Sequence, residues 1–216
     1  GAGGHYRVYG KSFDLNHTST INGRARDDAW DKGQVGFRAD WSRAGDEITV
    51  QGNAYRGTEG QPAPGTISTG ARFTLGDITI SGVNLTTRWA HRLEGNSNLV
   101  LQAYFDRTER SVPPTFAQTL NIVDLQLQHS LQPSGIHAFV WGAAYRYGMD
   151  RVTNSTFFAF LPGSVNQTWA SLFAQDEVTL RENLQLTLGA RLERNDYTGM
   201  EILPSARLAW KVAPDH

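Results

Sequence analysis

Hydrophobic and polar residues alternate along most of this chain with the two-residue period of a β-strand. Residues 168–192 form two arms separated by the short join Arg181-Glu182-Asn183, and the alternation is cleanest in the second arm. One face of the second arm carries Leu184, Leu186, Leu188, Ala190 and Leu192. Because so short a join leaves no room for a crossover, the two arms are expected to pair as an antiparallel hairpin.

Two places depart from clean alternation. In the first arm of the hairpin, Trp169 and Phe173 share a face with polar residues, which predicts a β-bulge or a change of register in that arm. Farther upstream, the apolar parity changes between Ile80 and Val83. A one-residue bulge near Ser81-Gly82 is therefore expected as well.

The pattern predicts about ten strands of roughly 9 to 15 residues, longer than the usual strand of about five or six. Besides the two arms of the hairpin, the alternating segments are 4–16, 34–41, 48–55, 77–93, 99–106, 123–128, 138–147 and 205–210. Long polar loops are expected at 16–31, 57–76, 107–117 and 149–166, and short turns near 44, 95, 133 and 182.

Short and long connections are thus expected to alternate strictly. In an up-and-down sheet this places every short turn at one end and every long loop at the other, the arrangement of a barrel with periplasmic turns and extracellular loops. The expected fold class is therefore all-β: an antiparallel, up-and-down transmembrane β-barrel, with residues 1–216 as a single barrel segment. The Leu, Val, Phe and Ala faces are expected to meet outer-membrane lipid, and the polar faces to line a wet interior.

The amino-acid composition excludes some classes of binding partner and site. A formal net charge of -1 offers no basic field for nucleic acid. Cysteine is absent, which excludes disulfides and thiolate sites. The mean hydropathy of -0.41 is no argument against a barrel, because alternating membrane strands give a weak hydropathy signal. The tryptophans, most of them near strand ends as expected for interfacial girdles, are Trp30, Trp41, Trp89, Trp141, Trp169 and Trp210.

Several segments resemble the barrel strands of TonB-dependent outer-membrane receptors. They are Gly36-Phe37-Arg38-Ala39-Asp40-Trp41, Gly52-Asn53-Ala54-Tyr55-Arg56-Gly57, Ser171-Leu172-Phe173-Ala174-Gln175-Asp176-Glu177, Leu188-Gly189-Ala190-Arg191-Leu192-Glu193 and Leu203-Pro204-Ser205-Ala206-Arg207-Leu208-Ala209-Trp210. The resemblance covers most of the chain. It implies a bacterial outer-membrane receptor that imports a scarce nutrient, most often a ferric siderophore, with energy supplied by the TonB complex.

The chain also departs from that family. Family members resemble a two-part design with an N-terminal plug inside a barrel of 22 strands, and neither the plug nor the energy-coupling segment is recognisable here. Residues 212–216 look like a further short turn. The chain therefore resembles a mid-barrel slice that has two open edges. Three outcomes are open: closure into a smaller barrel, self-association through the edges, or completion by the rest of a longer chain. Pairing of the first and last strands is the working hypothesis.

Candidate chemistry concentrates on the long-loop side. Guanidinium groups form bidentate bonds to carboxylate and related oxygens, so arginines there suit an anionic iron chelate. The candidate ligand-binding residues are Arg24, Arg26, Tyr55, Arg107, Arg110 and Arg151. Solvated loops, or arginines paired with lipopolysaccharide phosphates, are the alternatives. The six histidines lack metal-site spacing and no G-x-S-x-G motif occurs, so no metal site, cofactor or enzymatic activity is expected.

Two other functions compete with the receptor. A small complete outer-membrane barrel would serve as a passive pore or a structural protein. A soluble β-sandwich binding module would also alternate, but with shorter strands and without two loop lengths.

Overall fold

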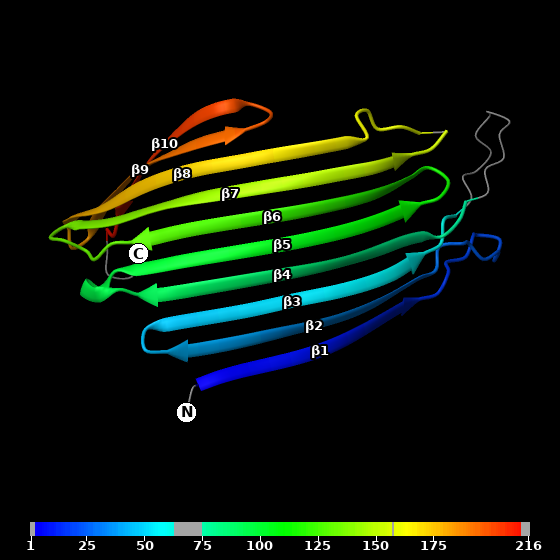
Figure 1. Ribbon diagram of the computed structural model, residues 1–216, viewed down its shortest axis with the longest axis horizontal. Helices are drawn as coiled ribbons and strands as arrows, with labels where there is room; N and C mark the ends of the chain where they lie inside the picture. Colours follow the sequence, from blue (N-terminus) through cyan, green and yellow to red (C-terminus); the bar gives the residue numbers. More distant parts are fainter. Residues whose placement is uncertain (1–2, 63–74, 157, 213–216) are drawn as a thin grey trace.

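Ten long strands make up nearly all of the protein in the computed structural model, which describes residues 3–62, 75–156 and 158–212 (Figure 1). The strands are β1 (Gly3–Leu15), β2 (Trp30–Arg43), β3 (Asp46–Glu59), β4 (Ile78–Arg92), β5 (Asn98–Val112), β6 (Phe116–Ser130), β7 (His137–Asn154), β8 (Ser164–Arg181), β9 (Leu184–Asn195) and β10 (Gly199–Trp210). One turn of 3-10 helix, η1 (Glu94–Asn96), joins β4 to β5. The predicted strand count is confirmed, and so is the predicted length for every strand except β7 and β8, which have 18 residues each.

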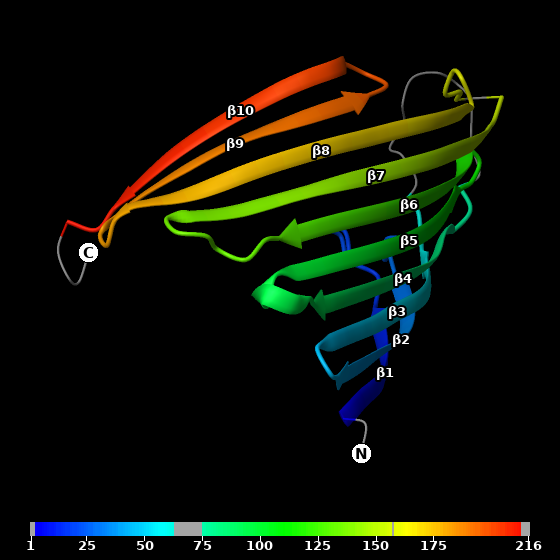
Figure 2. The same cartoon turned by 60° about the vertical axis from the view of Figure 1, so that its left-hand side comes forward.

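The ten strands form one sheet in which each pairs antiparallel with its sequence neighbours, in the order β1 to β10. The sheet curves into an open trough (Figure 2). The hypothesis that the first and last strands pair is wrong, because β1 and β10 form the two edges. A sandwich is also excluded among the described residues, because they form one layer instead of two packed sheets.

The two faces of the sheet differ in chemistry. Paired residues on neighbouring strands lie on the same face, so the register sorts every side chain. The apolar face includes the row Leu85, Phe105 and Val123, and the polar face includes the adjacent row Asn84, Asp106 and Ile122. The apolar face is not covered: Leu125 is 50% exposed, and Ala90 is the only buried apolar residue of the described part. An uncovered face of this kind requires an apolar medium instead of water.

At one end of the sheet, here the turn end, the strands are joined by tight connections. Ala44 and Gly45 both have positive φ, at 48° and 93°, which is the geometry of a two-residue hairpin turn. The tryptophans that lie on the apolar face near this end are Trp41, Trp89, Trp141 and Trp210. The Trp89 Nε1 donates to the Asp46 carboxylate at 2.8 Å, with its ring on the apolar face. These four positions agree with the expected girdle.

The opposite end, here the loop end, corrects two expected loops. Residues 107–112 and 116–117 belong to β5 and β6, so only Pro113, Pro114 and Thr115 connect them. Residues 149–154 likewise belong to β7, and the loop that follows spans 155–163. The two loops were predicted too long because both faces of these strand ends carry polar residues, so the sequence shows no apolar period there. The strict alternation of short and long connections is therefore also wrong.

The two predicted bulges have different outcomes. Pairing between β3 and β4 runs unbroken through Ser81 and Gly82, so no bulge lies there; Ile80 simply faces the polar side. The bulge predicted for the first arm of the 168–192 hairpin is confirmed between Thr179 and Arg181. Residues 63–74 of the expected loop at 57–76, and residues 213–216 of the expected final turn, lie outside the described residues.

Candidate functional site

The strand register divides the predicted ligand-binding residues between the two faces. Tyr55 pairs with Gly82, and Arg110 pairs with Gln118, which places both side chains on the polar face near the loop end. Arg107 pairs with Val83 and Arg151 pairs with Thr119, which places both on the apolar face. Alternation along β5 therefore separates Arg107 from Arg110 although only two residues lie between them.

Arg24 and Arg26 lie in the connection between β1 and β2, which a carboxylate organises. Asp28 accepts hydrogen bonds from the backbone N–H of Thr18, at 2.7 Å, and from the Thr18 hydroxyl. These bonds, the hydroxyl bond foremost, hold the pKa of Asp28 below its usual value of 3.8. The Arg26 N–H donates to the Thr18 carbonyl at 2.8 Å. The loop backbone is thus tied down while both arginine side chains remain exposed.

Tyr55 is held between a glycine and a cation. A Cβ on Gly82 would lie 2.6 Å from the Tyr55 Cε1, so only glycine leaves room for the ring at this position. The Lys32 ammonium lies 4.3 Å from the ring centroid, in cation–π contact. Sequence reasoning missed Lys32, because residues up to 31 were assigned to a loop and the parity of Lys32 was not extended from Gln34. Lys32, Tyr55 and Arg110 form the candidate site on the polar face.

An aromatic cluster lies at the loop end, where β6 begins. Phe158 and Phe160 stack edge to face at 4.9 Å between centroids, and Phe160 lies 5.5 Å from Phe116 at the start of β6. Asn154 fixes Phe160 through two hydrogen bonds, to its carbonyl at 3.0 Å and from its N–H at 2.9 Å. No local pattern in the sequence predicts this cluster, since the contact joins a loop to a strand some forty positions away.

Deeper along the polar face, side chains form connected hydrogen-bond networks. Asp124 is nearly buried and accepts from the Arg146 Nε and from the Gln126 Nε2, each at 2.8 Å. Toward β1, the Tyr9 hydroxyl donates to Asn53, which in turn donates to Asn84 at 3.1 Å. Such a wall can hydrogen-bond water or a polar segment, which agrees with a wet interior.

The described residues contain no group of three or more His, Cys, Asp or Glu side chains placed to hold a metal ion. None of the described helices is long and apolar enough to cross a membrane.

The family profile described as "TonB dependent receptor-like, beta-barrel" matches residues 4–216. The chain belongs to the TonB-dependent receptor family. This family consists of receptors and transporters, and the open sheet is a segment of its barrel wall. No curated protein sequence matches this TonB-dependent receptor barrel.

Solved structures agree with the TonB-dependent receptor fold. The siderophore receptor PirA from Pseudomonas aeruginosa superposes with a TM-score of 0.71 at 14% identity, covering 97% of this chain and 34% of that one. PirA from Acinetobacter baumannii gives 0.75 at 12% identity, covering 98% and 36%. The ferric enterobactin receptor PfeA from Pseudomonas aeruginosa gives 0.72 at 15% identity, covering 98% and 37%. The chain therefore spans about a third of the length of these receptors.

Proposed function

We propose that this chain is part of the wall of an outer-membrane, TonB-dependent transporter that takes up a ferric siderophore or a similar scarce nutrient. The observation that carries the proposal is the family match over residues 4–216. The uncovered apolar face suits lipid, and the polar face suits a water-filled interior. In this orientation the turn end is periplasmic and the loop end extracellular. The energy-coupling complex would act through parts of the protein outside this chain.

The ligand is proposed to meet the polar face at the extracellular end. Lys32 and Arg110 supply positive charge there, and the Tyr55 phenol supplies a hydrogen-bond donor. Arg24 and Arg26 extend the same chemistry into the loop above. An anionic chelate with carboxylate or phenolate oxygens matches these donors. Arg107 and Arg151 are not part of the proposed ligand site, because their side chains lie on the apolar face and point away from the interior.

Binding and uptake of iron chelates by the full-length protein test the proposal. Cells that lack other siderophore receptors but express this protein are expected to bind a radioactive ferric chelate saturably, and to accumulate it only while the energy-coupling complex is intact. Arg110→Gln should weaken binding about tenfold, the equivalent of ~1.4 kcal/mol for a lost charged hydrogen bond. Arg88→Gln, deeper on the same face, is the matched control and should bind normally.

The passive pore remains the competing function. If a broad panel of chelates shows no saturable binding, and the protein in planar bilayers conducts ions steadily, the transporter proposal is wrong. A pore would also be indifferent to the energy-coupling complex.

A further inference from the structure

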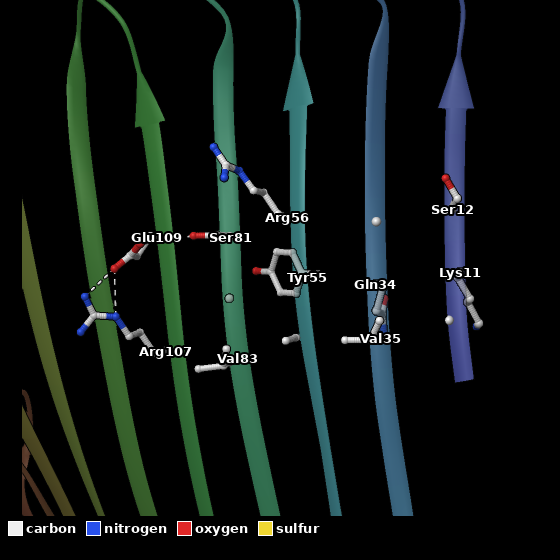
Figure 3. Close-up of a pocket in the computed structure, with 14 residues that line it drawn as sticks. Lys11, Ser12, Gln34, Val35, Tyr55, Arg56, Ser81, Val83, Arg107 and Glu109 are labelled. Carbon is white, nitrogen blue, oxygen red and sulfur yellow. Dashed lines mark hydrogen bonds and ion pairs between the residues drawn. The ribbon is translucent and has the colours of Figure 1, made fainter. Parts of the chain in front are cut away.

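A cavity of 730 Å³ opens on the apolar face near the extracellular end, across β1 to β5 (Figure 3). The residues that decide its character are Val35, Arg56, Ser81, Val83, Arg107 and Glu109. A second cavity of 560 Å³ adjoins it and shares Arg56, Ser81 and Glu109. The two hollows therefore form one continuous groove across β1 to β6 on the outside of the wall.

The register makes this groove amphipathic along the strands. Arg56, Ser81 and Glu109 pair in one row across β3, β4 and β5. Two residues nearer the membrane centre, the next row of the same face begins with Val35, Ala54 and Val83. The groove thus has an apolar lower half and a polar upper rim. The rim marks the level at which the apolar face ends.

One positive charge in the rim has no hydrogen-bond or ion-pair partner among the described residues. Arg107 and Glu109 form an ion pair, and the Ser81 hydroxyl donates to the Glu109 carboxylate at 3.2 Å. The Arg56 guanidinium has neither a hydrogen bond nor an ion pair to any residue in the described ranges. It leans from β3 over β4, above Ser81 (Figure 3). Arg56 is exposed, and arginine stays charged at any physiological pH, so its guanidinium is open to an anion from outside the protein.

The depth of Arg56 indicates the source of that anion. It stands at the outer border of the lipid-facing surface, where headgroup phosphates lie beside a basic side chain. Arg151 continues the same row through Thr119, and it donates only to backbone carbonyls, those of Asp150 at 2.8 Å and Val165 at 3.3 Å. A second cation therefore faces the same layer two strands beyond Glu109.

We propose that this groove binds a phosphate-bearing lipid of the outer leaflet. The Arg56 guanidinium contacts the phosphate, the Ser81 hydroxyl turns its proton from Glu109 to the phosphate, and Arg107 neutralises Glu109. An acyl chain lies along Val35 and Val83. The inference rests on the membrane orientation given under the proposed function. An iron chelate does not suit the groove, because this face points away from the interior, and free phosphate leaves the apolar half unexplained.

Native mass spectrometry of the full-length protein in mild detergent tests the proposal. The probes are lipid A carrying two phosphates, the same lipid after enzymatic dephosphorylation, and inorganic phosphate. The wild type should bind the phosphorylated lipid and bind the dephosphorylated one at least about fivefold less well, the equivalent of ~1 kcal/mol per basic residue at a membrane surface. Arg56→Gln should show the same loss, and Arg56→Lys should restore part of it.

Arg110→Gln is the matched control, since the register puts its side chain on the opposite, polar face although its backbone borders the second cavity. It should keep lipid binding and lose chelate binding, whereas Arg56→Gln should do the reverse, so failure of this inference is distinguishable from failure of the transporter proposal. If Arg56→Gln does not insert, Glu109→Gln should raise lipid occupancy by removing the opposing carboxylate. Equal binding of both lipids, or competition by inorganic phosphate alone, would overturn the proposal.

Discussion

Tyr55 and Arg56 are neighbours in the chain, yet they belong to different environments. Tyr55 lies on the polar face under the Lys32 ammonium, and Arg56 lies on the apolar face in a groove with a hydrophobic floor. Arg110 and Arg107 divide in the same way on β5. Residue type alone therefore does not decide which partner an arginine meets in this wall. The strand parity decides it, because a step of one residue moves a side chain from interior to lipid.

The largest expected effect comes from placing a charge in the middle of each face, which tests whether one face meets lipid and the other meets water. Leu125→Arg should destabilise the membrane-embedded protein by about 2–4 kcal/mol, because the guanidinium would enter the hydrocarbon. Gln126→Arg, one residue along, should change stability little, since Asp124 is there to pair with it. Urea unfolding in lipid vesicles compares the two. Equal effects would show that the faces are not divided between lipid and water.

The fit of Tyr55 on the polar face is tested with glycine substitutions. Gly82→Ala should cost about 1–3 kcal/mol of stability through overpacking, because its Cβ would displace the tyrosine ring and so also weaken chelate binding. Gly33→Ala is the control, since no atom lies within 4 Å of the position its Cβ would occupy. Unfolding curves and chelate titrations measure both effects. Normal chelate binding by Gly82→Ala would remove Tyr55 from the proposed site.

A smaller effect is expected from the buried carboxylate of the polar face. Asp124→Asn should destabilise the protein by about 1–2 kcal/mol, because the Arg146 guanidinium loses a charged acceptor. Asp40→Asn removes an exposed pair with Arg38, and should have the weaker effect since water solvates both groups. The same unfolding assay ranks the two variants. A reversed ranking would mean that Asp124 is reached by water in the assembled barrel.

The smallest effect is local and depends on pH. The pKa of Asp28 lies below its ordinary value, so the order that Asp28 gives to the loop is complete above pH 3.8 and is lost as the pH falls through the lowered pKa. Hydrogen exchange at the Thr18 amide, corrected for intrinsic rates, should therefore keep its protection above pH 3.8 and lose it as the pH falls further. Asp28→Asn should be less protected at every pH. A pH-independent wild type would contradict the assignment.

The sequence predicted most of the fold because the apolar period is local. Leu184 to Leu192 and Leu99 to Phe105 lie on the apolar face as expected. Arg107 and Arg110 were placed in a loop because a strand that leaves the apolar layer no longer alternates. The cluster around Phe116 depends on a contact distant in the chain, and the groove at Arg56 depends on pairing across β3 to β5. Neither can be read from one segment.

Each strand of the wall pairs only with the strands that precede and follow it in the chain. Stability in such an array approximates a sum of nearest-neighbour terms, as it does in repeat proteins. A hairpin can therefore be gained or lost as a unit without changing contacts elsewhere in the sheet, provided that both flanking strands still pair with a neighbour. A wall built in this way can change its circumference by whole hairpins while the surviving strands keep their registers.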